Sequence, residues 1–483
     1  MNDAKYFAIL CDETTDIRAV TQLSFCVRFI ESNKIYEEFL QFVPVTDCTG
    51  LGLANSICEG MKDMGLNTEH LVGQGYDGAN AMSGALRGTQ AFVRKNHPKA
   101  LYVHCCSHSF NLSLSEGCNI PEMRNCFGVI ETVYNFFKYP KRMHILELQI
   151  DKLQEKPRSE KLKRLCPTSW IERHDSVRAF IELLDPLLSA LIDISDWNDK
   201  KVATDAHLLL SAVCKCDFLI CLFCTESVFD LTLPLSKYLQ TENIDLNLAV
   251  KSATNVQKTL QNYRCNVNEI FSNIFLKVST LCDKHEINIS RPRIAGRQTH
   301  RQNIPSESVE KYYKRAIFIP FLDVTIQSIN QKFVNHRDIL SQFQNFLETS
   351  ESDGVINSIE KLNTFYNLTD ETIVGEIHLW QQFLNGLDKK PDNALSALEM
   401  CNKNMFPVIY KLLSILATLP VTTCTCERSF SSLKFLKSYL RNSTGEERLN
   451  GLAMMFVHES VSVSEEEVLD ELSLKRRKLN ILL

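Results

Sequence analysis

The sequence lacks an excess of positive charge. Its 53 lysines and arginines stand against 58 aspartates and glutamates, a formal net charge of −5. A globally basic nucleic-acid-binding protein is therefore excluded, and any DNA contact must come from local patches. No stretch reads as an apolar run of the roughly 20 residues that a membrane-spanning helix needs, and nothing before the first predicted strand resembles a secretory signal. We expect a soluble protein with no membrane contact and no small-molecule substrate.

Cysteine is abundant, but its distribution does not indicate a disulfide framework. The 18 cysteines are scattered over 483 residues, which favours reduced thiols in the nucleus or cytosol. An apolar fraction of 44% is typical of a globular protein with a real core. The length predicts two to four domains of roughly 150 residues each.

The first 124 residues alternate between β-rich runs and amphipathic segments. Polar Ser32-Asn33 indicates a hairpin, and Thr49 is a plausible helix N-cap for a stripe that includes Leu51, Ala54 and Ile57. The predicted strands are 6–11, 22–31, 34–45, 71–77 and 100–104, and the predicted helices are 50–64, 85–96 and one beginning near 110. The order β-β-β-α-β-α-β-α is that of an RNase H-like α/β domain.

Helical periodicity replaces the α/β pattern after residue 124. Residues 125–404 are expected to form a large all-α insertion domain, with single helices over 177–194 and 207–222. A Pro-, Gly- and Arg-rich stretch at 288–305 predicts a mobile basic loop. Residues 405–462 return to amphipathic helix with a break at Leu419-Pro420, and 463–483 form a charged tail.

Three acidic residues stand where a two-metal phosphoryl-transfer site would need them. Asp12 closes the first predicted strand, Asp77 follows the fourth, and Glu427 begins a helical pattern. Two Mg²⁺ ions about 3.5–4 Å apart, held by such carboxylates, stabilise the attacking and leaving oxygens of a phosphodiester. Because Asp77 and Glu427 are 350 residues apart, a large insertion must separate them. Glu13 should face away from Asp12 on an alternating strand, and Asp16 should cap a turn.

Six segments carry a family resemblance: 7–16 (FAILCDETTD), 75–80 (GYDGAN), 104–108 (HCCSH), 168–170 (TSW), 419–431 (LPVTTCTCERSFS) and 449–455 (LNGLAMM). In this order they resemble the transposases of the hAT (hobo/Activator/Tam3) superfamily and the proteins derived from them. The resemblance implies an RNase H-like core, interrupted by the helical domain and completed by a C-terminal dimerisation region. It makes Asp12, Asp77 and Glu427 the catalytic acids and the ligands of Mg²⁺ or Mn²⁺.

The resemblance also implies roles for residues outside the acids. Cys105 and His108 match the family's Cys-x-x-His motif, and Trp170 matches a tryptophan that stacks on a flipped base. A zinc site at the Cys-His pair is not expected, because structural zinc needs four ligands; packing beside the active site is the preferred interpretation. From the residue alone, a core position for Trp170 is as open as the base-stacking role.

Local basic clusters are the candidates for contacting DNA. The cluster over 138–164 includes Lys161, Lys163 and Arg164, and the 288–305 loop adds Arg291 and Arg293. These charges form either a phosphate track or an ordinary solvated face. The basic 475–478 run indicates nuclear localisation.

Apolar stripes at the C-terminal end divide between an intramolecular core and a homodimer interface. The interface candidates are Phe406, Leu412, Leu413, Phe430, Leu433, Leu449 and Leu452.

Two functions from different classes fit this sequence. One is a domesticated or truncated derivative that dimerises and associates with DNA, since no zinc-binding DNA-recognition module precedes the first strand as it does in related transposases. The other is an active Mg²⁺-dependent enzyme that cleaves and joins DNA ends. A free-standing RNase H-fold nuclease is disfavoured by the long insertion and the C-terminal motif.

Overall fold

The computed structural model forms two compact units. Residues 1–103 and 417–483 make up unit 1, and residues 104–416 make up unit 2. The structure describes residues 5–166, 170–292, 306–343, 346–347, 353–369, 371–438 and 441–474. The divisions between the units fall at 103/104 and 416/417, whereas the boundaries expected from the sequence lie at 124/125 and 404/405.

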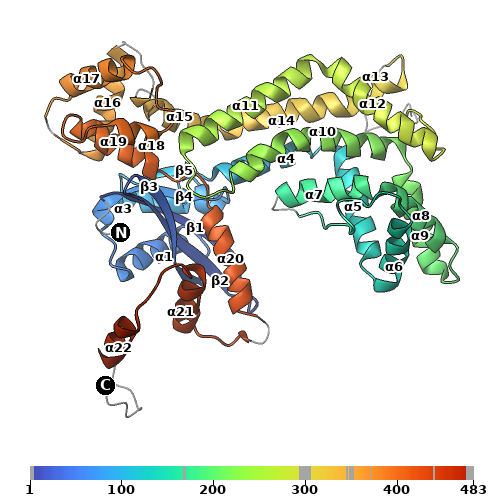
Figure 1. Cartoon of the computed structure of the whole chain (residues 1–483), viewed down its shortest axis with the longest axis horizontal. Helices are drawn as coiled ribbons and strands as arrows, with labels where there is room; N and C mark the ends of the chain where they lie inside the picture. Colours follow the sequence, from blue (N-terminus) through green and yellow to red (C-terminus); the bar gives the residue numbers. More distant parts are fainter. Residues whose placement is uncertain are drawn as a thin grey trace. The chain divides into compact units, whose positions relative to one another are not determined.

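Unit 1 is a five-stranded sheet with helices on both faces (Figure 1). The strands lie in the order β3-β2-β1-β4-β5; β1 pairs antiparallel with β2 and parallel with β4, and β2 pairs antiparallel with β3. The elements are β1 (Phe7–Thr15), β2 (Thr21–Glu31), β3 (Lys34–Val45), α1 (Gly50–Asp63), η1 (Thr68–His70), β4 (Leu71–Tyr76), α2 (Asn80–Ser83), α3 (Thr89–Asn96), β5 (Leu101–His104, whose last residue begins unit 2), α20 (Cys424–Leu436), α21 (Glu446–Val457) and α22 (Glu465–Leu474). This order confirms the predicted mixed α/β architecture.

Local signals in the sequence explain the start of the sheet. Ser32 and Asn33 both have positive φ, 48° and 57°, as the tight two-residue turn of a twisted hairpin requires. The side chain of Thr49 accepts a hydrogen bond from the N–H of Gly52 at 3.2 Å and caps α1. Leu51, however, is 50% exposed, so it lies outside the buried stripe to which the sequence assigned it.

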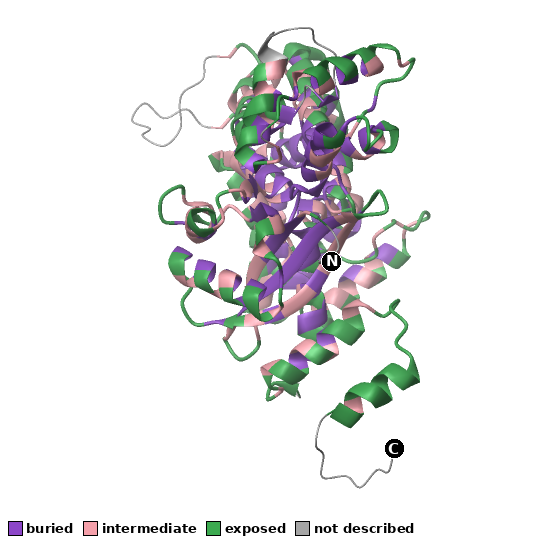
Figure 2. Cartoon of the chain, turned by 90° about the vertical axis from the view of Figure 1, so that its left-hand side faces the viewer, coloured by how far each residue is buried: buried purple, intermediate pink, exposed green. Residues whose placement is uncertain are grey.

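The alternation of side chains along β1 determines what covers each face of the sheet. Ile9 and Cys11 point into a core formed with α1, whereas Leu10 points into a second core with α20 and α21. Figure 2 shows these strands as the most continuously buried part of unit 1. Asp12 follows the parity of Leu10 and therefore faces α20.

Unit 2 consists of helices in its described part, apart from the end of β5. They are α4 (Cys106–Gly117), α5 (Pro121–Phe137), α6 (Pro140–Asp151), α7 (Trp170–Glu182), α8 (Leu184–Ser195), α9 (Lys200–Val213), α10 (Cys216–Tyr238), α11 (Leu246–Cys265), α12 (Val267–Lys284), α13 (Val309–Tyr313), the π-helix η2 (Lys314–Phe318), α14 (Ile319–Lys332), α15 (Val334–Phe343), α16 (Asp353–Tyr366), α17 (Val374–Asn385), α18 (Ala394–Met400) and α19 (Pro407–Thr418), whose last two residues belong to unit 1.

Two expected single helices are each divided in the structure. The 177–194 stripe spans α7 and α8, which meet at Leu183, and the 207–222 stripe spans α9 and α10. In both cases the apolar periodicity continues across the break because both helices bury the corresponding face, so periodicity alone could not locate the boundary.

Helix α10 corrects the expectation that no apolar run approaches a bilayer's thickness. It is 23 residues long, and its most apolar window has a mean hydropathy of 1.7, enough to cross a membrane by length and composition. Of that window, 61% is buried inside the protein, as is usual for the central helix of a packed bundle. No other helix in the described residues meets both criteria.

Candidate functional site

Two of the three acids lie side by side at the carboxyl ends of neighbouring parallel strands. The register of β1 and β4 places Leu10 opposite Gly75. Continuing it by two residues sets Asp12 opposite Asp77, directly after β4. Oδ1 of Asp77 accepts a hydrogen bond from the N–H of Ala79 at 3.1 Å, which fixes the turn after the strand.

The third acid comes from the far end of the chain. Glu427 lies in the first turn of α20, whose Cys426 is fully buried in the core that Leu10 enters. The negative charges of Asp77 and Glu427 both contribute to raising the pKa of Asp12. The fold of unit 1 therefore brings Asp12, Asp77 and Glu427 within electrostatic range of one another. Their catalytic and metal-binding roles stay predictions.

Burial and the neighbouring negative charges disfavour the charged forms of the Asp12 and Glu427 carboxyl groups. Burial raises the pKa of Asp12 well above its usual value, and the charges of Asp77 and Glu427 raise it further. Desolvation of the carboxyl raises the pKa of Glu427 although the residue is exposed overall. Burial and the charge of Asp77 also raise the pKa of Glu13. Glu13 has the opposite side-chain parity on β1, as expected, yet it remains within electrostatic range of the site.

The chemistry of this donor set fits a divalent cation, since clustered carboxylate oxygens are the ligands that Mg²⁺ prefers. A cation would relieve the repulsion that raises these pKa values. Within the described ranges, however, no three His, Cys, Asp or Glu side chains are close enough to hold one metal ion. The side chains would have to close around a cation before it could be bound.

A network of buried hydrogen bonds attaches the segment that carries Glu427 to the sheet. Arg28 is fully buried; its Nε and Nη2 donate to the carbonyl of Ala417 at 3.3 and 3.1 Å, and its Nη1 pairs with Glu37 at 2.6 Å. The hydroxyl of Thr425 donates to the other oxygen of Glu37 at 2.6 Å and accepts from Arg428 at 2.8 Å. These bonds flank Glu427 on both sides in sequence.

Glycines of β4 allow the same segment to lie flat against the sheet. A Cβ at Gly75 would lie 2.6 Å from the Cβ of Pro420, and one at Gly73 would lie 2.8 Å from its Cδ. Side chains are excluded there because the proline ring occupies the space. The predicted break at Leu419-Pro420 is therefore a docking point beside Asp77.

A buried lysine, Lys437, caps the C-terminal end of α20. Nζ of Lys437 lies 2.6 Å from Asp16 and 3.3 Å from Glu446, and the Lys437 and Asp16 side chains are 2% and 1% exposed. Gln22 donates to the same two acids, at 3.3 Å each. Asp16 also accepts from the N–H groups of Arg18 and Val20, which confirms its predicted role in a turn.

The Cys-His motif begins helix α4 in unit 2. Sγ of Cys105 accepts a hydrogen bond from the N–H of His108 at 3.4 Å, and the His108 ring lies 5.9 Å from that of His104. Burial and the neighbouring His336 lower the pKa of His104 to about 3. The motif thus caps α4 beside His104 and His336, two imidazoles whose pKa values burial lowers.

Trp170 is a core residue in this structure. It is 2% exposed; its ring lies 4.5 Å from that of Phe229, and the Arg173 guanidinium lies 5.1 Å from its centroid. Its indole offers no free face to a base, so the geometry does not support the expected stacking role. The sequence left both positions open, because an aromatic residue in a core cannot be told by sequence from one on a stacking platform.

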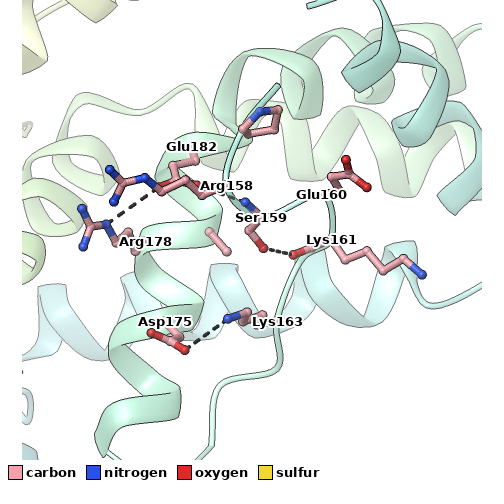
Figure 3. Close-up of a pocket in the computed structure, with 10 residues that line it drawn as sticks. Arg158, Ser159, Glu160, Lys161, Lys163, Asp175, Arg178 and Glu182 are labelled. Carbon is pink, nitrogen blue, oxygen red and sulfur yellow. Dashed lines mark hydrogen bonds and ion pairs between the residues drawn. The ribbon is translucent and has the colours of Figure 1, made fainter. Parts of the chain in front are cut away.

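The basic segment before α7 borders a pocket of about 540 Å³ (Figure 3). Within it, Lys163 pairs with Asp175 at 3.1 Å, while Lys161 is exposed. Arg164, next in the chain, pairs with Glu131 at 3.8 Å. Two of the three predicted phosphate contacts are thus already neutralised.

The basic loop is described only at its first residues. Nη1 of Arg291 donates to the carbonyl of Ser306 at 2.9 Å, so it too has a partner within the protein. Arg293, with the remainder of the loop to 305 and the 475–478 run, lies outside the described residues.

The predicted interface residues are mostly core. Those that are fully buried or nearly so are Phe406, Leu412, Leu413, Leu433 and Leu449, and they divide between the two units. Phe430 and Leu452 are partly buried against the second core of unit 1. These side chains form the cores of the two units, and a burial stripe cannot be told from an interface stripe by spacing.

Exposed apolar residues lie beside that stripe. Phe435 is 66% exposed and stacks on Phe456 with 5.2 Å between ring centroids; Met454 and Met455 are 38% and 68% exposed. We call these four residues the α20–α21 patch. They fall off the buried periodicity of α20 and α21, which is the signal that could have found them.

Comparisons with known proteins find a family profile at each end of the chain. Residues 1–88 match the profile described as the ZMYM1/FAM200 RNase-like domain, and residues 376–461 match the hAT family C-terminal dimerisation region. The chain is similar to the 52 kDa repressor of the inhibitor of the protein kinase, at 27% identity over 475 residues to the human protein and 26% over 479 residues to the mouse protein. These alignments cover 95% of this chain and 62% of the length of each relative.

The two family profiles lie at opposite ends of the chain, and unit 1 joins residues 1–88 of the first to residues 417–461 of the second. The chain thus carries an RNase-like domain and the hAT family C-terminal dimerisation region, which makes it similar to the transposases of the hAT superfamily and the proteins derived from them.

Proposed function

We propose that this protein is a domesticated hAT derivative that forms a homodimer through the α20–α21 patch and associates with DNA in the nucleus. The single observation that carries the proposal is the cluster of exposed aromatic and methionine side chains inside the matched dimerisation region. Its relatives are named as repressors, and a regulatory role requires binding rather than turnover.

The composition of the patch supports self-association. Phe435 and Phe456 form a stacked pair that remains open to solvent on its outer side. Aromatic residues and methionine are enriched at the centres of protein interfaces, and contiguous exposed apolar patches mark them. A two-fold axis through such a patch would place identical rings against each other, as in an isologous dimer.

Sedimentation of the full chain tests the dimer. We expect wild type to sediment as a dimer at micromolar concentration and Phe435→Asp to sediment as a monomer with an unchanged melting temperature. The matched control is Leu379→Asp, which charges a 52% exposed leucine of α17 inside the same matched region. A Phe435→Asp variant that remains dimeric would place the interface elsewhere.

Catalysis is a second candidate function, and the convergence of three acids from β1, the end of β4 and α20 favours it. Asp12, Asp77 and Glu427 would hold Mg²⁺ or Mn²⁺, which when bound stabilises charge developing on the phosphate oxygens of a DNA end. The chain itself supplies Arg428, exposed beside Glu427, as a cation for a phosphate. Arg28 and Glu37 keep the third acid in place.

Nicking of DNA ends distinguishes the two functions. Purified full chain would be incubated with Mg²⁺ or Mn²⁺ and labelled hairpin-capable ends, beside Asp77→Asn. An active transposase should nick the DNA, and Asp77→Asn should abolish the reaction, because the remaining carboxylates cannot hold the ions. DNA binding without nicking supports the domesticated function, and nicking that survives Asp77→Asn rules out this site.

A further inference from the structure

Aromatic rings and cations gather at the corner where α5 meets α6 in unit 2. Tyr139, which with Lys138 separates the two helices, is 61% exposed, and Lys138 and Lys141 beside it are exposed. The Arg142 guanidinium lies 4.6 Å from the Tyr139 ring centroid and 4.3 Å from that of Phe136. Its Nη1 also donates to the Phe136 carbonyl at 3.1 Å. The guanidinium thus packs against one face of the tyrosine ring.

A second ring belongs to the same surface. Trp197 follows α8, which packs against α6, and Nζ of Lys141 lies 4.6 Å from its ring centroid. Trp197 is half-buried, whereas Trp170 and Trp380 are 2% and 0% exposed. Of the three tryptophans, Trp197 alone is only partly buried.

The cations of this corner are available to a ligand. In the part of the chain that the structure describes, no carboxylate forms an ion pair with Lys138, Lys141 or Arg142, in contrast to Lys163 and Arg164. Three acids lie within four residues of Trp197: Asp193 accepts a hydrogen bond from Gln149, Asp196 is exposed, and Asp199 accepts from the N–H groups of Lys201 and Val202 at the start of α9. A negatively charged ligand would therefore approach over Lys138 and Lys141 rather than over the end of α8.

We propose that this corner binds single-stranded DNA, with bases stacked on Tyr139 and Trp197 and the phosphate backbone running past Lys138 and Lys141. The inference rests on the proposed DNA association and gives the stacking role to these rings instead of the buried Trp170. Aromatic faces beside a cationic track bind unpaired bases, whose faces are open, and discriminate against duplex, whose base faces are covered.

Binding and fluorescence of the full chain test the site with a 20-nucleotide oligo(dT) and a duplex of the same length. Wild type should bind the single strand, and Tyr139→Ala should weaken that binding by about tenfold or more, the effect expected for one stacked base. Tyr139→Phe, which keeps the ring, should bind like wild type. Lys141→Glu should weaken binding and reduce its salt dependence, whereas Lys258→Glu, at an exposed lysine of α11, should not.

Tryptophan emission gives a readout that a purely structural corner would not change. Saturating oligo(dT) should quench the emission of wild type, and Trp197→Phe should remove the quenching because the two remaining tryptophans are buried. Wild type that binds neither DNA would overturn the proposed DNA association and this site together. DNA binding that is unaffected by Tyr139→Ala and Lys141→Glu, in variants with unchanged melting temperatures, would overturn this site alone.

Discussion

The two units of this protein are held together in different ways. Unit 1 joins segments that are about 400 residues apart through buried polar groups: Arg28 with Ala417, Ser24 with Ser429, and Phe42 with Asn450. Unit 2 packs helices into an apolar core rich in thiols, among them Cys221 and Cys224, whose pKa values burial raises. Buried hydrogen bonds therefore hold the distant C-terminal segment on the sheet of unit 1. Unit 2 is held together mainly by close packing of apolar side chains.

Lys437→Met should produce the largest effect of the changes considered. It leaves Asp16 and Glu446 without their cation in a buried site, and breaking such a pair costs about 3–5 kcal/mol. Urea unfolding at pH 7 measures the loss, and hydrogen exchange should place it in unit 1. Lys434→Met, at an exposed lysine of the same helix, should change stability by less than about 0.5 kcal/mol.

The pH dependence of the same variant gives a check on the cause. Burial would raise the pKa of Asp16, but hydrogen bonds from Lys437, Val20 and Arg18 outweigh it and leave the pKa lowered. A lowered pKa in the folded state contributes stability above the usual aspartate value, and this contribution is lost as the pH falls through the folded value. The difference between wild type and Lys437→Met should therefore shrink in acid. A constant difference would contradict an electrostatic origin.

Gly75→Ala should have an intermediate effect and compares the two units directly. The new Cβ would lie 2.6 Å from Pro420 and 2.9 Å from the Leu10 side chain, and such overpacking costs about 1–3 kcal/mol. Gly128→Ala in α5 meets nothing within 4 Å and should stabilise unit 2 by about 0.5–1 kcal/mol. Equal effects of the two changes on urea unfolding would show that Pro420 does not dock on β4.

Asp12→Asn should have the smallest effect, and its sign is opposite. Because the folded-state pKa of Asp12 is raised, its contribution to stability is present below the usual aspartate pKa and is lost as the pH rises through the folded value. Removing the charge should therefore raise the melting temperature at pH 7 and leave it unchanged near pH 3. Mg²⁺ should stabilise wild type more than the variant; a lower melting temperature for Asp12→Asn at pH 7 would contradict the repulsion.

Local chemistry allowed much of unit 1 to be predicted from the sequence. The five strands, the Ser32-Asn33 turn and the Thr49 cap depend on residues adjacent in the chain, and the family motifs then linked Glu427 to Asp12 and Asp77. The exact ends of unit 2's helices were not predictable, because a buried stripe continues through the break at Leu183 without any change in composition.

The burial of single aromatic and apolar residues could not be predicted from the sequence either. Trp170 is covered by Phe229, 59 residues away in the chain, and Leu449 is covered by strands more than 400 residues upstream. Which residue remains exposed is decided by these distant partners. Phe435, two positions after buried Leu433, shows that neighbours in sequence can have opposite environments.

The side chain of Asn450 seals the outer edge of the sheet. Its amide donates to the carbonyl of Phe42 at 2.9 Å and its oxygen accepts from the Phe42 N–H at 2.8 Å, as a neighbouring strand would, and His458 contacts the Phe39 carbonyl at 2.8 Å. The two partners are 408 residues apart. At roughly 5–20 residues per second, a ribosome needs about 20–80 s to synthesise the chain from Phe42 to Asn450. During synthesis the edge of the nascent β3 therefore stays open to pairing with other chains until Asn450 has emerged.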